Sequence, residues 1–115
     1  MKSSAVFLKH IFKELEFLAK ETENLDFQAF LKDERLTRAC ARSLEIIGEA
    51  VKNLDSAFKA QHEHVDWKKI AGLRDKIIHH YFGVNWDIVW DVLTTKLPEF
   101  KSQVTRMLHE SEFKR

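Results

Sequence analysis

The chain has 115 residues, a length that fits one domain and can bury a core without disulfides or structural metals. Its 44% apolar and 32% charged residues are ordinary for a globular protein, and a net charge of +1 gives none of the overall basic character typical of nucleic-acid-binding domains. A single cysteine, Cys40, excludes an intrachain disulfide and a cysteine-based metal site, and one proline with three glycines argues against an all-β fold.

The N-terminal segment contains charged residues from its second position, so we expect neither a signal peptide nor a membrane-spanning helix. From about Ser4 to Glu21, apolar residues recur at helical spacing and predict a first long helix. Asp26 is then expected to cap a short extra helical turn. Together with the lone cysteine, these features predict a cytoplasmic protein with one domain over residues 1–115.

A second long helix is predicted from about Glu34 to Ala60, where apolar residues line one face. Gly48 lies inside it, at a cost of about 1 kcal/mol relative to alanine, and close approach of a neighbouring helix would be a reason for it. Asp66 is expected to cap a third helix that ends at Gly83. One face of that helix would carry Ile70, Leu73, Ile77 and Tyr81.

Asn85 is expected to cap a fourth helix that continues to about Leu108. Pro98 falls within this segment and should kink or split the helix near Thr95–Leu97. The predicted fold class is therefore all-α, an up-and-down bundle of four long helices plus a short one.

Polar residues are concentrated at the end of the third predicted helix. On a straight helix, Arg74 and Tyr81 lie nearly on one face, whereas His79 points about 140° away from Arg74. Arg74 and His79 would therefore converge only across a bent helix end or across a two-fold axis between two copies. Asp75 and His79 are four residues apart and can pair, which would orient the imidazole. These residue types suit phosphate chemistry, although a helix with polar side chains facing water is the simpler interpretation.

The order of Arg74, His79 and Tyr81 matches the R-x4-H-x-Y motif of HEPN-domain proteins. The chain more narrowly resembles the HepT toxins of MntA–HepT toxin–antitoxin pairs. The IGEA-containing helix of that family resembles LEIIGEAVKNL, and its motif region resembles VDWKKIAGLRDKIIHHYFGVNWDIVWDVLTTKLPEF. Many relatives carry asparagine after the motif arginine, where this sequence has Asp75.

The resemblance implies a HEPN-like bundle that forms a homodimer, with an active site between the protomers that carries Arg74 and His79 of each. It implies a metal-independent endoribonuclease toxin of a type II-like or type VII toxin–antitoxin pair, without a cofactor, acting on RNA such as tRNA or mRNA. It also implies that an MntA-like nucleotidyltransferase antitoxin silences the nuclease by AMPylation of Tyr81. The alternative is a non-catalytic substrate-binding or regulatory partner of a minimal nucleotidyltransferase.

Three further residues are candidates for supporting the site. Asp75 could raise the basicity of His79, and Glu49 in the IGEA stretch could pair with Arg74. His80 is interpreted as exposed or as a secondary phosphate contact, and Lys76 as a solvated charge.

The run His62, His64, Asp66 could in principle ligate a metal, because imidazole suits zinc, copper and nickel. We interpret it instead as a polar loop and predict no metal. Cys40 is predicted to be a small buried hydrophobe rather than a nucleophile. The tryptophans Trp67, Trp86 and Trp90 are predicted to be core or interface residues.

Overall fold

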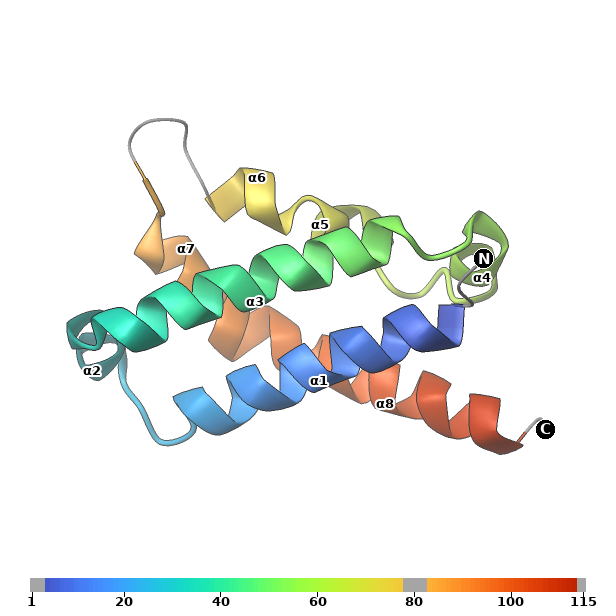
Figure 1. Cartoon of the computed structure of the whole chain (residues 1–115), viewed down its shortest axis with the longest axis horizontal. Coiled ribbons are helices and arrows are strands. Elements are labelled where there is room, and N and C mark those ends of the chain that lie inside the picture. Colours follow the sequence, from blue (N-terminus) through green and yellow to red (C-terminus); the bar gives the residue numbers. More distant parts are fainter. Residues whose placement is uncertain (1–3, 78–82, 114–115) are drawn as a thin grey trace.

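The structure is a computed structural model that describes residues 4–77 and 83–113, with side chains as far as residue 110. Its elements are α1 (Ser4–Thr22), α2 (Phe27–Lys32), α3 (Glu34–Lys52), α4 (Ser56–Gln61), α5 (Trp67–Ala71), α6 (Leu73–Ile77), α7 (Trp86–Asp91), the π-helical turn η2 (Val92–Lys96) and α8 (Leu97–Phe113). In Figure 1, α3 lies beside α1 on one side and beside α5 and α6 on the other, and α8 crosses beneath α1. The predicted all-α class is confirmed.

The helix starts follow from short polar side chains that accept hydrogen bonds from otherwise unpaired backbone N–H groups. The carboxylate of Asp26 accepts from the N–H of Ala29 at 2.8 Å, and that of Asp66 accepts from Lys69 at 3.2 Å. The side-chain oxygen of Asn85 accepts from the N–H of Ile88 at 3.2 Å. All three predicted caps are therefore confirmed.

The prediction of one helix from Glu34 to Ala60 is wrong, because α3 ends at Lys52 and α4 begins at Ser56. The side-chain amide of Asn53 donates to the carbonyl of Glu49 at 2.8 Å and competes with helical continuation at this point. The chain turns after this break, and Leu54 is buried in the core.

The third predicted helix is also interrupted, since α5 ends at Ala71 and α6 begins at Leu73. Glycine has a low helix propensity, and Gly72 is the residue at the break. The break lies against α3: a Cβ added to Gly48 would meet the carbonyl oxygen of Ala71 at 3.3 Å. The close approach expected at Gly48 is therefore confirmed. Because Gly48 has no Cβ, the backbones of α5 and α3 can lie in contact there.

The fourth segment runs as α7, η2 and α8 without leaving a helical path. Pro98 has no N–H to donate to the carbonyl of Thr94, and the chain widens into the π-helical turn η2 directly before it. The N–H of Leu97 donates to the carbonyl of Val92, five residues earlier, which is the π-helical pattern. The disturbance predicted near Pro98 is confirmed, as a π-helical turn instead of a sharp kink.

The core between these helices is apolar and rich in aromatic rings. Trp67 is buried, and Trp86 and Trp90 pack against the core, so their predicted structural role is confirmed. Cys40 is buried as predicted, and burial, followed by the carboxylates of Glu21 and Asp33, raises the pKa of its thiol to about 12. The thiol therefore stays protonated at neutral pH and is a poor nucleophile. None of the helices in the described part of the chain is long and apolar enough to span a membrane.

Candidate active site

Arg74 lies on α6, between the buried residues Leu73 and Ile77 in sequence. Those two apolar side chains hold α6 in the core, whereas the side chain of Arg74 is about half exposed, at 52%. Its Nε lies 3.6 Å from Oε2 of Glu45 on α3. The structure thus presents the predicted phosphate-binding cation at the surface and orients it from a neighbouring helix.

Glu45 interacts with two arginines at once. Its Oε2 also lies 3.6 Å from Nη1 of Arg42, one turn earlier on α3. The side chain of Glu45 is 29% exposed, compared with 71% for Arg42 and 52% for Arg74. The least exposed of the three charges therefore sits between two guanidinium groups that both reach solvent.

The pairing of Glu49 with Arg74, one possibility from the sequence, is not found among the described residues. Among the described residues, the carboxylates within ion-pair distance of Arg74 belong to Glu45 and Asp75, and Glu49 pairs with Lys52 at 3.5 Å. Because α6 runs antiparallel to α3 and Ala71 already lies over Gly48, Arg74 lies over an earlier turn of α3. Gly48 as a contact point, combined with antiparallel packing, is the sequence signal that could have identified Glu45.

Asp75 lies beside the arginine that precedes it. Its Oδ1 is 3.8 Å from Nη1 of Arg74, and both side chains are exposed. The carboxylate of Asp75 is thus close to the guanidinium of Arg74.

A shallow groove of about 320 Å³ adjoins Arg74 on the α1 and α3 side. Its lining comes from α1, α3, α6 and the residue after α3, and includes Phe7, His10, Arg42, Glu45, Asn53 and Arg74. The rings of Phe7 and His10 meet edge to face with centroids 6.4 Å apart. We call this the Arg42–Arg74 groove.

A second groove, of about 440 Å³, lies on the other side of α6 and is bordered by α5, η2 and α8. Its rim carries Lys69, Lys76 and Lys96 above an apolar floor. Lys69 lies 3.8 Å from Asp66, and Lys76 is exposed, as expected for a solvated charge. The short helix α6 therefore separates two grooves, with Arg74 bordering one and Lys76 the other.

The predicted site residues His79, His80 and Tyr81 lie outside the described residues, so their roles and the helix end expected at Gly83 stay predictions. The chain on either side of residues 78–82 is described. The N–H of Asn85 donates to the carbonyl of Ile77 at 2.9 Å, which ties the end of α6 to the residue that caps α7. Gly83 has φ of 84°, a backbone conformation that glycine adopts without strain.

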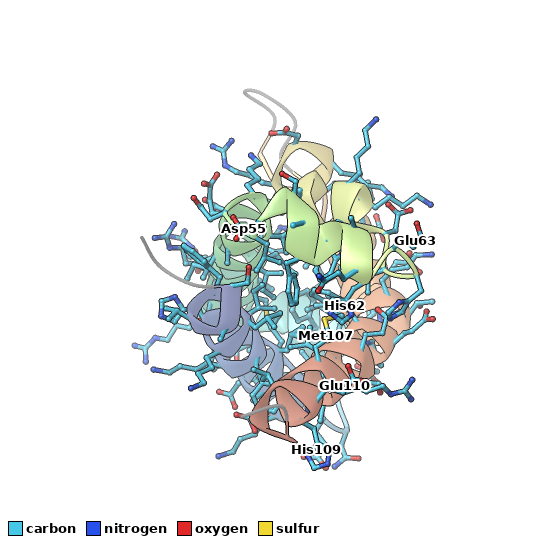
Figure 2. The ribbon with its side chains drawn as sticks, turned by 90° about the vertical axis from the view of Figure 1, so that its right-hand side faces the viewer. Asp55, His62, Glu63, Met107, His109 and Glu110 are labelled. Atoms are coloured by element: carbon cyan, nitrogen blue, oxygen red, sulfur yellow. The ribbon has the colours of Figure 1, made fainter. Side chains whose placement is uncertain are left out.

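The histidine run before α5 belongs to the fold of that end of the bundle. The His62 ring packs on Phe58 with centroids 4.7 Å apart, and its carbonyl accepts from Nε1 of Trp67 at 3.0 Å. Figure 2 shows His62 turned toward the bundle and Glu63 at its outside. Within the part of the chain that the structure describes, no group of three or more His, Cys, Asp or Glu side chains is placed to hold a metal ion.

An oriented, solvent-accessible arginine beside a groove is a candidate binding site for phosphate groups, and this all-α bundle presents one. A family model described as "Ribonuclease HepT-like" matches residues 11–107, which is most of the chain. The chain belongs to this family, and the resemblance to HepT proteins found in the sequence is confirmed.

Individual relatives cover nearly the whole chain. It is 49% identical over 112 residues to a "Putative RNase" of Caldanaerobacter subterraneus subsp. tengcongensis, covering 97% of this chain and 100% of that protein. It is 40% identical to a "Putative RNase" of Methanocaldococcus jannaschii, covering 96% and 92% of the two chains. It is 35% identical to the "Probable ribonuclease HepT" of Thermococcus cleftensis, covering 92% and 96%. No solved structure matches the chain.

Proposed function

We propose that the chain is a metal-independent endoribonuclease toxin that cuts RNA in a cleft shared by two protomers, with Arg74 and His79 as its catalytic residues. The observation that carries the proposal is the solvent-accessible guanidinium of Arg74, oriented by Glu45, in a chain that belongs to a family named as ribonucleases. The relatives named as RNases match along almost their full length, which supports the same activity here.

The proposed reaction is attack of a ribose 2′-oxygen on the adjacent phosphorus. His79 of one protomer accepts the proton of the 2′-hydroxyl as the new O–P bond forms. His79 of the partner protomer donates a proton to the 5′-oxygen as the P–O5′ bond breaks. The products are a 2′,3′-cyclic phosphate and a 5′-hydroxyl, and positioned proton transfer of this kind is typically worth about 10²–10⁴-fold in rate.

Arg74 is proposed to bind the scissile phosphate and stabilise the charge that develops on it. Its ion pairs to Glu45 and Asp75, at 3.6 and 3.8 Å, are longer than close charge-assisted hydrogen bonds. Half-exposed pairs of this length contribute about 0–1 kcal/mol, so a phosphate can compete for the guanidinium donors. Because Asp75 lies beside Nη1, a phosphate that binds the outer edge of the guanidinium would compete with that carboxylate.

The proposal is tested by incubating purified, unmodified protein with RNA in excess chelator. We expect cleavage to persist and the new 3′ ends to carry 2′,3′-cyclic phosphates. Activity that chelator removes and a divalent cation restores would contradict the metal-independent mechanism. A chain that binds a nucleotidyltransferase but never cuts RNA would favour the alternative function of a non-catalytic partner.

Regulation is proposed to act on Tyr81, through AMP groups transferred by an MntA-like nucleotidyltransferase antitoxin. A nucleotide attached seven residues after Arg74 would bring an anionic phosphodiester to the site and compete with RNA for the guanidinium. After co-expression with such an enzyme, we expect the intact mass to rise by whole AMP units and RNA cleavage to fall. Tyr81→Phe should keep its original mass and its activity, and a mass increase in that variant would place the modification elsewhere.

A further inference from the structure

We propose that Arg42 binds an RNA phosphate and that the Arg42–Arg74 groove is a subsite for the nucleotide next to the one cleaved. This inference rests on the proposed ribonuclease function and adds a substrate-binding residue to it. Arg42 lies on α3, outside the motif that carries Arg74 and His79.

The geometry places a second cation beside the proposed catalytic arginine. Nη1 of Arg42 and Nε of Arg74 each lie 3.6 Å from the same oxygen of Glu45, so these two nitrogens are no more than twice that distance apart. Two guanidinium groups at that separation can contact one phosphate together or two consecutive phosphates. An RNA strand held by Arg74 would therefore pass within reach of Arg42.

The exposure of Arg42 allows an anion to bind at this point. The two guanidinium groups share Glu45, Arg74 also lies 3.8 Å from Asp75, and Glu49, which lines the groove as well, pairs with Lys52. A guanidinium has five N–H donors, and the Arg42 side chain is 71% exposed. Most of its donors are thus accessible to a ligand from solvent, and phosphate is the anion whose geometry a guanidinium fork matches.

The rest of the groove suits the remainder of a nucleotide. Phe7 is partly buried and His10 is exposed, and both rings line the same groove as the two arginines. Aromatic side chains next to a cationic track are the usual means of holding single-stranded nucleic acid, since any base can stack on them. The combination of cations and rings therefore favours RNA over a simple anion such as free phosphate.

The test measures binding without cleavage, using a fluorescent 2′-O-methyl oligoribonucleotide, which lacks the attacking hydroxyl. Arg42→Ala is compared with Arg38→Ala, a matched control one turn earlier on α3. Arg38 is 76% exposed and pairs with Glu34 at 2.6 Å. Neither residue is among the described residues that line the groove. We expect Arg42→Ala to weaken binding about tenfold and to lower the salt dependence, the slope of log K against log salt, by about 0.7. Arg38→Ala should change neither.

Two more variants separate direct contact from an indirect effect on Arg74. Arg42→Lys keeps the charge, so it should retain the salt slope and recover part of the affinity. The double variant Arg42→Ala/Arg74→Ala is compared with Arg74→Ala alone. Direct contact predicts that Arg42→Ala weakens binding further in the Arg74→Ala background, whereas an effect that acts only through Arg74 predicts no further loss.

The outcomes distinguish this inference from the function on which it rests. If the original chain cleaves and binds RNA but Arg42→Ala behaves like Arg38→Ala, the subsite is overturned and the ribonuclease stands. If Arg42→Ala causes no further loss of binding in the Arg74→Ala background, the direct contact is likewise overturned. If the original chain neither binds nor cleaves RNA, the proposed function fails and the subsite fails with it.

Discussion

Replacement of Arg74 with alanine is expected to lower the rate of RNA cleavage by about 10²–10³-fold, the usual effect of removing one group that stabilises transition-state charge. His79→Ala should lower it by about 10²–10⁴-fold, because a positioned proton donor or acceptor is lost. The Arg74 side chain is half exposed and its ion pairs are long, so the unfolding temperature of Arg74→Ala should stay nearly unchanged. Cleavage rates and thermal unfolding of the same preparations provide the measurement.

Lys76→Ala is the matched control, since Lys76 lies two residues further along the same short helix and borders the other groove. It should leave the cleavage rate within a factor of a few of the original chain. Full activity of Arg74→Ala would remove Arg74 from the mechanism, and an equal loss in Lys76→Ala would show that α6 tolerates no change.

Mixed dimers test whether the cleft is shared. A dimer with one original protomer and one His79→Ala protomer keeps one complete motif. Because the proposed reaction uses the histidines of both protomers, this mixed dimer should cleave RNA at far less than half the original rate. If each protomer held a complete site, the mixed dimer would keep about half the original rate.

Local rules predicted the parts of the fold that depend on few residues. The caps at Asp26, Asp66 and Asn85 need only a short polar side chain and nearby N–H groups. The disturbance before Pro98 follows from its missing N–H. The breaks at Asn53 and Gly72 were missed because each depends on where the neighbouring helices require the chain to turn, which helical periodicity in a single segment does not contain.

The candidate site was likewise predictable from the sequence only in part. The sequence motif identified Arg74, and the structure places it at the surface beside a groove. The choice of Glu45 over Glu49 as its partner depends on the offset between the antiparallel helices α3 and α6, which is set by the contact at Gly48. One helical turn separates the two glutamates, so an error of one turn in that offset exchanges them.

Phe30→Ala is expected to cause a large loss of stability. Phe30 is fully buried and is the one buried residue of α2, a helix of 6 residues. Its ring lies 5.0 Å from the ring of Trp90 and 6.1 Å from that of Trp86, both on α7. Removing a buried phenyl ring costs about 3–5 kcal/mol in free energy of unfolding, and these ring contacts place the cost in the upper part of that range.

The substitution should also affect the candidate site, because α2 holds α7 through these rings and the residue that caps α7, Asn85, bonds to the end of α6. Chemical denaturation at neutral pH measures the loss, with Leu31→Ala as the control on the same helix. Leu31 is 38% exposed, so its replacement should change the free energy of unfolding by about 0.5 kcal/mol or less. A similar small change in Phe30→Ala would mean that α2 does not anchor α7. A large loss in both variants would mean that α2 as a whole, and not the buried ring of Phe30 in particular, contributes the stability.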